Sequence, residues 1–290
     1  MDGKFTRAID LSGAQGVIVL LEPACGLVPH GIRLSPADWP RLHMSARLGD
    51  EAVLAADRLR FVRSGLVIDL TMAQTWQARL TDISIDWTRP QVVRAFERVR
   101  AQMAAQASAS PQDLAAILFA RRIATVTPAL IAAFRRLDAA VACEHLGGLV
   151  GMGPGLTPSG DDFIIGCLAG LTVSARGERA RFHCLMRIAQ TLVTRLPATT
   201  RVSRQHLSDA FELEFAQPLA ALAGALANGD EDVVEHLRAA LAVGAHSGAD
   251  AAAGLLLALE AWRAPYAARA PVALLNAIDP PRAPALQLER

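Results

Sequence analysis

The chain changes character near residue 90, and this change limits the fold strongly. Before it, short runs rich in β-branched residues alternate with turn residues, as where Gly16–Leu21 is followed by Glu22-Pro23. Beyond it, apolar residues recur at a spacing close to that of an α-helix. Strands followed by helices are typical of an α+β protein. We therefore expect a small β-rich N-terminal domain over residues 1–90 and a larger all-α domain over residues 91–290.

Within the first part, the short runs predict a small sheet or a partly closed barrel. The predicted strands cover residues 16–21, 31–34, 59–62, 66–70 and 77–80, and residues 63–65 form a hairpin turn. The predicted helices cover residues 91–107, 112–122, 128–144, 161–175, 178–195, 204–214, 217–227, 230–241 and 249–262. Ser110-Pro111 is a start signal for the second helix, and residues 266–290 are expected to form a loosely held tail.

Charge and cysteine content narrow the functional class. The 29 Lys and Arg residues balance the 28 Asp and Glu residues, which argues against a surface for nucleic acid or an anionic membrane. The four cysteines have no C-x-x-C spacing, so we expect reduced thiols and no zinc ribbon. The N-terminus does not resemble a signal peptide, and the longest apolar run is far shorter than the ~20 residues of a membrane span. These features predict a cytoplasmic protein without nucleic-acid or membrane partners.

The segment GMGPGLTPSGDD, residues 151–162, combines closely spaced glycines with two prolines and runs into an apolar helix. Glycine allows a ligand to approach the backbone, proline stiffens the loop, and free N–H groups at a helix start attract anions. The segment is not a Walker A motif, and a tight turn before a capped helix is its purely structural interpretation. The predicted ligand-binding residues are Gly153, Gly155, Thr157, Ser159, Gly160 and Asp161.

A second copy of this device follows later in the chain. Residues 159–166 and residues 247–254 both read S-G-x-D-x-x-x-G, and both continue with leucines in register. Each has the form of a capping box, with Ser as the cap and Asp three residues on. We expect the two helices to be related by local pseudo-symmetry, with their N-termini meeting at one pocket. Ser247 and Gly248 then join the predicted binding residues.

Three residues are predicted to act in catalysis. Asp162 and Asp250 occupy equivalent positions in the two copies, and His246 directly precedes the second copy, where it is placed to act as a general base. Adjacent helical residues project ~100° apart, so we expect Asp162 to point inward and Asp161 to cap the helix or support the site.

A further polar segment follows Pro197 and is predicted to start another helix. Thr200 and Ser203 offer hydroxyl groups there. Arg201 and Arg204 offer guanidinium groups that can bind a carboxylate or a phosphate. A solvated polar turn is the alternative interpretation.

At these residues the sequence resembles the AllH-like family. GPGLTPSGDDF carries most of the likeness, and Thr200 to Ser203 and the H-S-G-A-D segment from His246 to Asp250 resemble two weaker signatures. The likeness extends over most of the chain. The family is similar to a subunit of the oxamate carbamoyltransferase of allantoin degradation, a branch of purine catabolism. That enzyme interconverts oxalurate plus phosphate with oxamate plus carbamoyl phosphate, and it needs partner subunits.

The resemblance implies a carbamoyltransferase subunit that acts on a small anionic amide together with partner subunits. A non-catalytic subunit that binds a small anion or supports assembly is the alternative. A metal-dependent phosphoryl-transfer enzyme using Asp161 and Asp162 is a weaker third interpretation. We expect no cofactor and no dedicated metal site, and the sequence gives no positive support for Mg²⁺.

Overall fold

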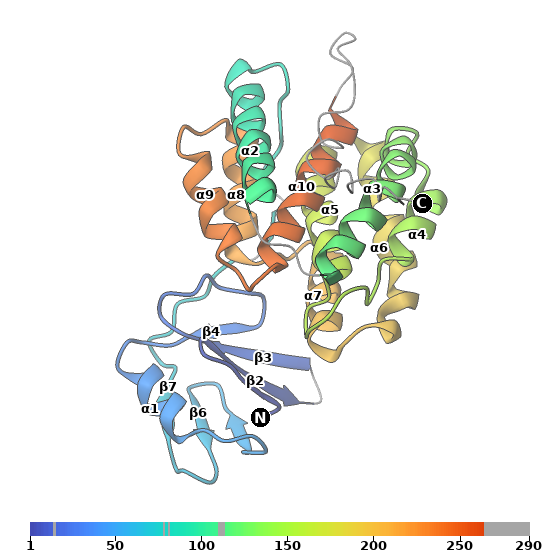
Figure 1. Ribbon diagram of the computed structural model, residues 1–290. Coiled ribbons are helices and arrows are strands. Elements are labelled where there is room, and N and C mark those ends of the chain that lie inside the picture. The colour runs from blue at the N-terminus through green and yellow to red at the C-terminus, as the bar shows by residue number, and fades with distance from the viewer. Residues whose placement is uncertain (14–15, 78, 81, 110–113, 264–290) are drawn as a thin grey trace, which may run out of the picture.

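The computed structural model describes residues 1–13, 16–77, 79–80, 82–109 and 114–263. Figure 1 shows two regions, with β-strands at the N-terminal end of the chain and a larger group of helices beyond them. The predicted α+β class is therefore confirmed. The start signal at Ser110-Pro111 and the predicted tail over residues 266–290 lie outside the described residues.

The N-terminal region contains two open sheets and no closed barrel among its described residues. The first sheet has the order β1 (Gly3–Lys4), β2 (Ala8–Gly13), β3 (Gly16–Leu21) and β4 (Gly31–Arg33). Its first two pairings are antiparallel, and β3 pairs with β4 in parallel. The second sheet is an antiparallel meander of β5 (Ala52–Leu54), β6 (Arg58–Phe61) and β7 (Val67–Asp69). A short helix, α1 (Asp38–Ser45), lies between them in the chain.

The N-terminal region has its own small hydrophobic core, built from strand side chains that alternate between buried and exposed positions. In β6 Leu59 and Phe61 are buried while the two arginines between and before them are exposed, as expected of a strand with one face on a core. These side chains pack with Ile9 and Leu20 of the first sheet and Leu42 of α1. The predicted strand over residues 77–80 is wrong, because its described residues form only an isolated bridge between Arg79 and Glu214.

The helical region begins at Pro90 and surrounds a second, larger core. Its helices are α2 (Pro90–Ala109), α3 (Leu114–Arg135), α4 (Ala139–Gly147), α5 (Ser159–Ala175), α6 (Arg179–Leu192), the 3₁₀ helix η1 (Val193–Ala198), α7 (Arg201–Phe211), α8 (Gln217–Asn228), α9 (Val233–Leu241) and α10 (Ser247–Trp262). Ile83, Ile85 and Trp87 already pack on this core. The domain boundary near residue 90 stays a prediction.

Two predicted helices are divided differently in the structure. The sequence places a break before Pro128, but α3 continues through this proline to Arg135. The chain turns instead at Leu137, which has a positive φ of 56°, and Asp138 then caps α4 by accepting from the Val141 N–H at 3.2 Å. A residue that leaves the helical conformation ended the helix here, whereas a proline inside it was tolerated.

Within the described part of the chain, α3 is the one helix long and apolar enough to cross a membrane by length and composition. Core helices of soluble proteins and signal sequences meet the same criterion. The buried residues of α3, including Phe119, Ile123 and Leu130, belong to the large core, and the helix packs against α4 and α10.

Contacts between the strands and the helices place the first sheet below the N-terminal end of α7 (Figure 1). Arg201 pairs with Asp2 at 3.4 Å and donates to the Gly13 carbonyl at 3.4 Å. The Leu27 N–H donates to the side-chain oxygen of Gln217, and the Gln217 N–H donates to the Leu27 carbonyl. The start of α7 is therefore fixed to the β2–β3 hairpin.

Candidate functional site

The helices α5 and α10 lie side by side in parallel and contact each other along most of their length (Figure 1). Glycines make this close approach possible. The Cα of Gly166 faces the Ala251 backbone so closely that an added Cβ would lie 2.7 Å from the Ala251 carbonyl carbon. A Cβ on Gly254 would lie 2.8 Å from the Cys167 nitrogen and closer still to the Phe163 oxygen. Only glycine fits at either position without separating the helices.

These contacts support the predicted pseudo-symmetry. In the repeat Gly166 corresponds to Gly254, and Phe163 corresponds to Ala251. Gly166 contacts the backbone oxygen of Ala251, and Gly254 contacts the backbone oxygen of Phe163, so the two glycines make equivalent contacts. The exchange of equivalent contacts is what a local twofold axis between the helices produces. The helix N-termini consequently lie together, as predicted.

The loops that precede the helices repeat the same backbone contacts. The Gly160 N–H donates to the Met152 carbonyl at 2.8 Å, and the Gly248 N–H donates to the Val243 carbonyl at 3.0 Å. Positive φ angles follow in both copies, at Gly153 (117°) and Gly244 (63°). The repeat therefore begins before the helices themselves.

The two loops differ in length between the glycine with positive φ and the first serine of the helix. Five residues separate Gly153 from Ser159, whereas two residues separate Gly244 from Ser247. The extension lies in the glycine-rich copy, and its residues 153–156 are exposed. Gly155 within it has a φ of 92°, and a Cβ there would meet nothing within 4 Å. The glycine-rich loop is thus an enlarged version of a turn that the second copy holds in minimal form.

The serines of the repeat do not cap their own helices, so the predicted capping boxes are wrong. The N-cap positions belong to Pro158 and His246, and neither helix start has a side-chain cap hydrogen bond. Ser159 and Ser247 are instead the first residues of their helices. Because the two helix starts adjoin, the Ser247 hydroxyl hydrogen-bonds to Thr157, which precedes α5.

The side chains at the two starts form a crossed arrangement. The Ser247 hydroxyl of α10 lowers the pKa of Asp162 on α5, and the Ser159 hydroxyl of α5 lowers the pKa of Asp250 on α10, so each serine lies beside the carboxyl of the other copy. Thr157 also lowers the pKa of Asp162, and its Oγ1 lies 2.8 Å from Ser247 Oγ. The structure therefore brings Asp162 and Asp250 into one cluster, with each carboxyl contacting the serine of the other copy.

The electrostatics of this cluster favour protonated carboxyl groups. Burial raises the pKa of Asp162 to about 7, and the charges of Asp250 and Asp161 add to the rise, while the hydroxyls of Ser247 and Thr157 oppose it. Burial also raises the pKa of Asp250 to about 6, against the opposing influence of Ser159 and His246. Carboxyl groups shifted in this way can take up or release a proton near neutral pH.

One oxygen of each carboxyl is left without a partner. Among the described residues, Oδ2 of Asp162 and Oδ2 of Asp250 are buried and accept no hydrogen bond. The Asp162 side chain is also almost completely buried, with 7% of its surface exposed. A buried acceptor without a donor is costly, and a ligand that donates N–H groups would satisfy both oxygens.

Asp161 has a different environment from its neighbour. It is fully buried and accepts from the Gly151 N–H at 2.9 Å, from the Ser203 hydroxyl at 2.7 Å and from the Thr199 hydroxyl. These bonds join the start of the glycine-rich loop to the start of α7. Asp161 holds the loop through another helix and does not cap its own.

The polar segment before α7 is engaged by the protein itself. The predicted helix start is confirmed, because Thr200 caps α7 by accepting from the Ser203 N–H at 3.1 Å. Thr200 also donates to the Leu156 carbonyl in the glycine-rich loop. Arg204 donates to the carbonyls of Leu196 and Thr199, and Arg201 contacts the first sheet. Both guanidinium groups predicted to clamp a substrate therefore serve protein contacts in this structure.

His246 and Gly248 lie at the second helix start, where the sequence places them. His246 is exposed, and its charge lowers the pKa of Asp250, so its ring is close to that carboxyl group. Gly248 is buried, and a Cβ there would lie 2.9 Å from the Ala240 carbonyl carbon. Its role is close packing against α9, whereas His246 faces solvent beside the cluster.

One contact between the two regions was not predicted from the sequence. His30, with a φ of 56°, places Nε2 3.3 Å from Oδ1 of Asp209, a buried carboxyl on α7 that also accepts from Gln205 at 2.8 Å. No local motif marks this pair, because its members are far apart in the chain.

Among the described residues, no group of three or more His, Cys, Asp or Glu side chains could hold a metal ion.

The arrangement can therefore attract an anion to two parallel helix starts while two carboxyl groups accept N–H donors beside it. Such a site suits a small molecule with a negative charge at one end and an amide at the other.

Comparison with known proteins gives one family match. Residues 149–259 match the family model described as oxamate carbamoyltransferase subunit AllH, which is a narrower span than the sequence likeness suggested. The matched span contains the glycine-rich loop, α7 and the second copy of the repeat. No curated protein and no solved structure matches the chain. This match supports an AllH-like family assignment and a subunit role in a carbamoyltransferase.

Proposed function

We propose that this chain is the subunit of a carbamoyltransferase that binds a small anionic amide, of the oxamate or oxalurate type, together with carbamoyl phosphate or phosphate. The observation that carries the proposal is the crossed cluster at the starts of α5 and α10. It holds two buried carboxyl oxygens without donors in a region where helix N–H groups favour an anion.

The unpartnered oxygens suit the amide end of the ligand. A primary amide carries two N–H donors, and the free Oδ2 atoms of Asp162 and Asp250 are acceptors that need donors. Binding of the amide would satisfy groups that are otherwise buried at a cost of about 1–3 kcal/mol each. A carboxylate-only ligand would gain nothing from these acceptors, so the cluster selects for the amide.

The glycine-rich loop suits the charged end. Its exposed residues 153–156 directly precede Thr157 of the cluster, and a Cβ on Gly155 would meet nothing within 4 Å. The parallel arrangement of α5 and α10 adds their N-terminal partial positive charges at the same place. A phosphate or carboxylate group would be bound there by backbone N–H donors.

Carbamoyl transfer to an amide needs a proton acceptor. As the amide nitrogen bonds to the carbamoyl carbon and phosphate leaves, the nitrogen loses a proton. In the proposed site Asp162, with a pKa of about 7, accepts this proton, and His246 beside Asp250 connects the cluster to solvent. The helix N-termini would stabilise the negative charge that develops on the tetrahedral centre and the leaving phosphate.

A non-catalytic, anion-binding or assembly role is the second candidate, and one observation favours it. Arg201 and Arg204, the guanidinium groups predicted to bind the substrate, are bound to other parts of the chain. In that case the isolated chain would bind a small anion without turning it over, and the partner subunits would supply the missing charge.

Calorimetric titration of the full chain with oxamate, oxalurate, carbamoyl phosphate and phosphate tests the proposal. We expect Asp162→Asn to weaken binding of the amide ligands about tenfold or more and to leave phosphate binding within about twofold. The matched control is Asp82→Asn, which neutralises an exposed aspartate outside the helical repeat. Affinity for the amides should also fall as pH drops from about 8 to about 5, because protonation removes acceptors. Absence of binding by all four compounds, or equal losses for amides and phosphate, would overturn the proposal.

Turnover separates the two candidate functions. If the full chain with its partner subunits forms oxalurate from oxamate and carbamoyl phosphate, and Asp162→Asn abolishes the reaction, the catalytic role stands. If Asp162→Asn weakens binding but leaves the turnover of the assembled enzyme unchanged, the chain has the non-catalytic role.

A further inference from the structure

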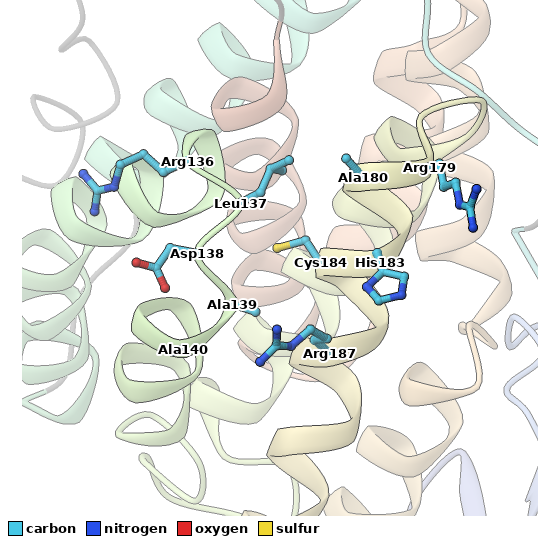
Figure 2. A pocket seen from close by; sticks show the side chains of 10 residues that line it. All are labelled: Arg136, Leu137, Asp138, Ala139, Ala140, Arg179, Ala180, His183, Cys184 and Arg187. Atoms are coloured by element: carbon cyan, nitrogen blue, oxygen red, sulfur yellow. The ribbon is translucent and has the colours of Figure 1, made fainter.

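A cavity of about 1000 Å³ lies between the turn from α3 to α4 and the first turns of α6 (Figure 2). Its walls contain none of the residues of the carbamoyl site, the name used from here for the cluster at the starts of α5 and α10 together with the glycine-rich loop. Ligand-binding pockets commonly reach this volume. The cavity is therefore large enough for an organic ligand of its own.

The charged residues of the cavity are mostly cationic. Arg136, Arg179 and Arg187 line it, and within the described part of the chain none of the three guanidinium groups forms an ion pair. The single lining carboxylate belongs to Asp138, whose Oδ1 accepts from the Val141 N–H. A cluster of unpaired arginines beside one occupied carboxylate favours a ligand with more than one negative charge.

The arginines come from both sides of the cavity. Figure 2 shows Arg187 extending from α6 toward the side on which Ala139 and Ala140 lie, whereas Arg136 and Arg179 project outward near its two ends. Burial raises the pKa of the Cys184 thiol to about 11, and the positive charge of Arg187 opposes this rise. Arg187 therefore extends into the cavity, whereas Arg136 and Arg179 stand at its two ends.

The rest of the wall is apolar. Leu137, Ala140 and Ala180 present aliphatic surface, and among the described lining residues the further donor or acceptor side chains are His183 and Cys184. An inorganic anion would leave this surface unused. A ligand with a flat apolar ring and a phosphate group would cover the wall and also pair with the planar guanidinium groups.

We propose that this cavity is a nucleotide site, in which Arg187 binds the phosphate groups of a nucleoside diphosphate or triphosphate, Arg136 adds positive charge at one end, and the base covers the apolar wall. The site is separate from the proposed carbamoyl site and does not depend on that proposal. Bound nucleotide would bridge the α3–α4 turn and the start of α6.

Titration calorimetry of the full chain with ADP, pyrophosphate and adenosine tests the site. We expect ADP to bind most tightly, pyrophosphate more weakly, and adenosine weakest. The double variant Arg136→Gln/Arg187→Gln should weaken ADP binding about tenfold or more, because the charge-assisted phosphate contact of Arg187 and the positive charge of Arg136 are lost. Arg94→Gln is the matched control, since it removes an exposed helical arginine on α2, and it should change ADP affinity less than about twofold.

Each other outcome bears directly on the proposal. Absence of ADP and pyrophosphate binding to the unaltered chain would overturn it and would favour an acidic protein segment as the occupant. Equal losses in the double variant and in Arg94→Gln would also overturn it. Equal affinities for ADP and pyrophosphate would contradict the role of the apolar wall. Asp162→Asn should leave ADP binding unchanged, so failure here is distinguishable from failure of the carbamoyl site.

Discussion

Replacement of Gly166 by alanine tests the central structural claim, that α5 and α10 are held at backbone contact. The added methyl group would lie 2.7 Å from the Ala251 carbonyl carbon, whereas ordinary contact begins at 3.4 Å. The helices would have to separate by at least about 0.7 Å at this point. No flexible side chain can yield instead, because the neighbouring atoms belong to backbone.

The expected cost follows from two opposing terms. Overpacking of a well-packed interior destabilises by about 1–3 kcal/mol and by more where backbone must move. Replacement of a helical glycine by alanine contributes about 1 kcal/mol in the opposite direction through helix propensity. Because backbone must move here, we take the overpacking cost at or above about 3 kcal/mol, which leaves a net loss of about 2 kcal/mol or more. For a chain of this size that loss lowers Tm by about 4–8 °C.

Urea unfolding followed by circular dichroism measures this difference. Gly224→Ala is the matched control, because Gly224 is a buried helical glycine in α8 whose added Cβ would meet Ile83 at 3.4 Å, an ordinary contact. We expect the control to be as stable as the unaltered chain or slightly more stable. If Gly166→Ala behaved like Gly224→Ala, the close approach of the two helices and the geometry of the cluster would both be refuted.

Three further outcomes are expected from the same cluster. Gly254→Ala should lose about as much stability as Gly166→Ala, since the two glycines make equivalent contacts, and urea unfolding of both variants checks this. The raised pKa of Asp162 keeps this carboxyl protonated in the folded state up to about pH 7, so the free energy of unfolding should fall as pH rises from about 4 to about 7. Asp162→Asn should flatten this fall and gain up to about 4 kcal/mol at pH 8. Urea unfolding of both proteins over this pH range measures the difference. Asp161→Asn should instead lose about 3 kcal/mol in unfolding experiments, because an amide cannot accept all the donors that Asp161 receives; equal effects of the two substitutions would contradict the different environments of these neighbours.

Local patterns in the sequence were sufficient for much of the fold. The runs at Gly16–Leu21 and at residues 59–62 form strands because alternating apolar side chains have one core to face, and periodic apolar residues after Pro90 form helices. The helix break at Pro128 was wrong, because surrounding core contacts hold α3 together through one missing N–H group. The turn at Leu137 carries no glycine or proline and so had no local signal.

The site was predictable only as far as the repeat reveals it. Equal spacing in residues 159–166 and 247–254 correctly predicted two adjoining helix starts. The same spacing also suggested that each serine caps its own helix, since a capping box is a local motif. The partner of each serine lies on the other helix, and a contact across the pseudo-symmetry axis leaves no trace in either copy alone. The cavity between α4 and α6 had no signal in the sequence either, because its lining residues come from two segments that are brought together only by folding.

The differences between the two copies indicate how a ligand would be oriented. A perfect repeat would present two equal ends and would bind a ligand in either direction. Here the loop before α5 is longer, carries the exposed Gly155 and is anchored through Asp161 to α7, whereas the loop before α10 ends in His246. The symmetric part, Asp162 and Asp250, suits a group with two equivalent N–H donors, and the asymmetric part offers backbone N–H groups on the α5 side and a titratable ring on the other. If the proposed function is correct, the pseudo-symmetry would explain recognition of the amide, and the difference between the two loops would set the direction in which the anion lies.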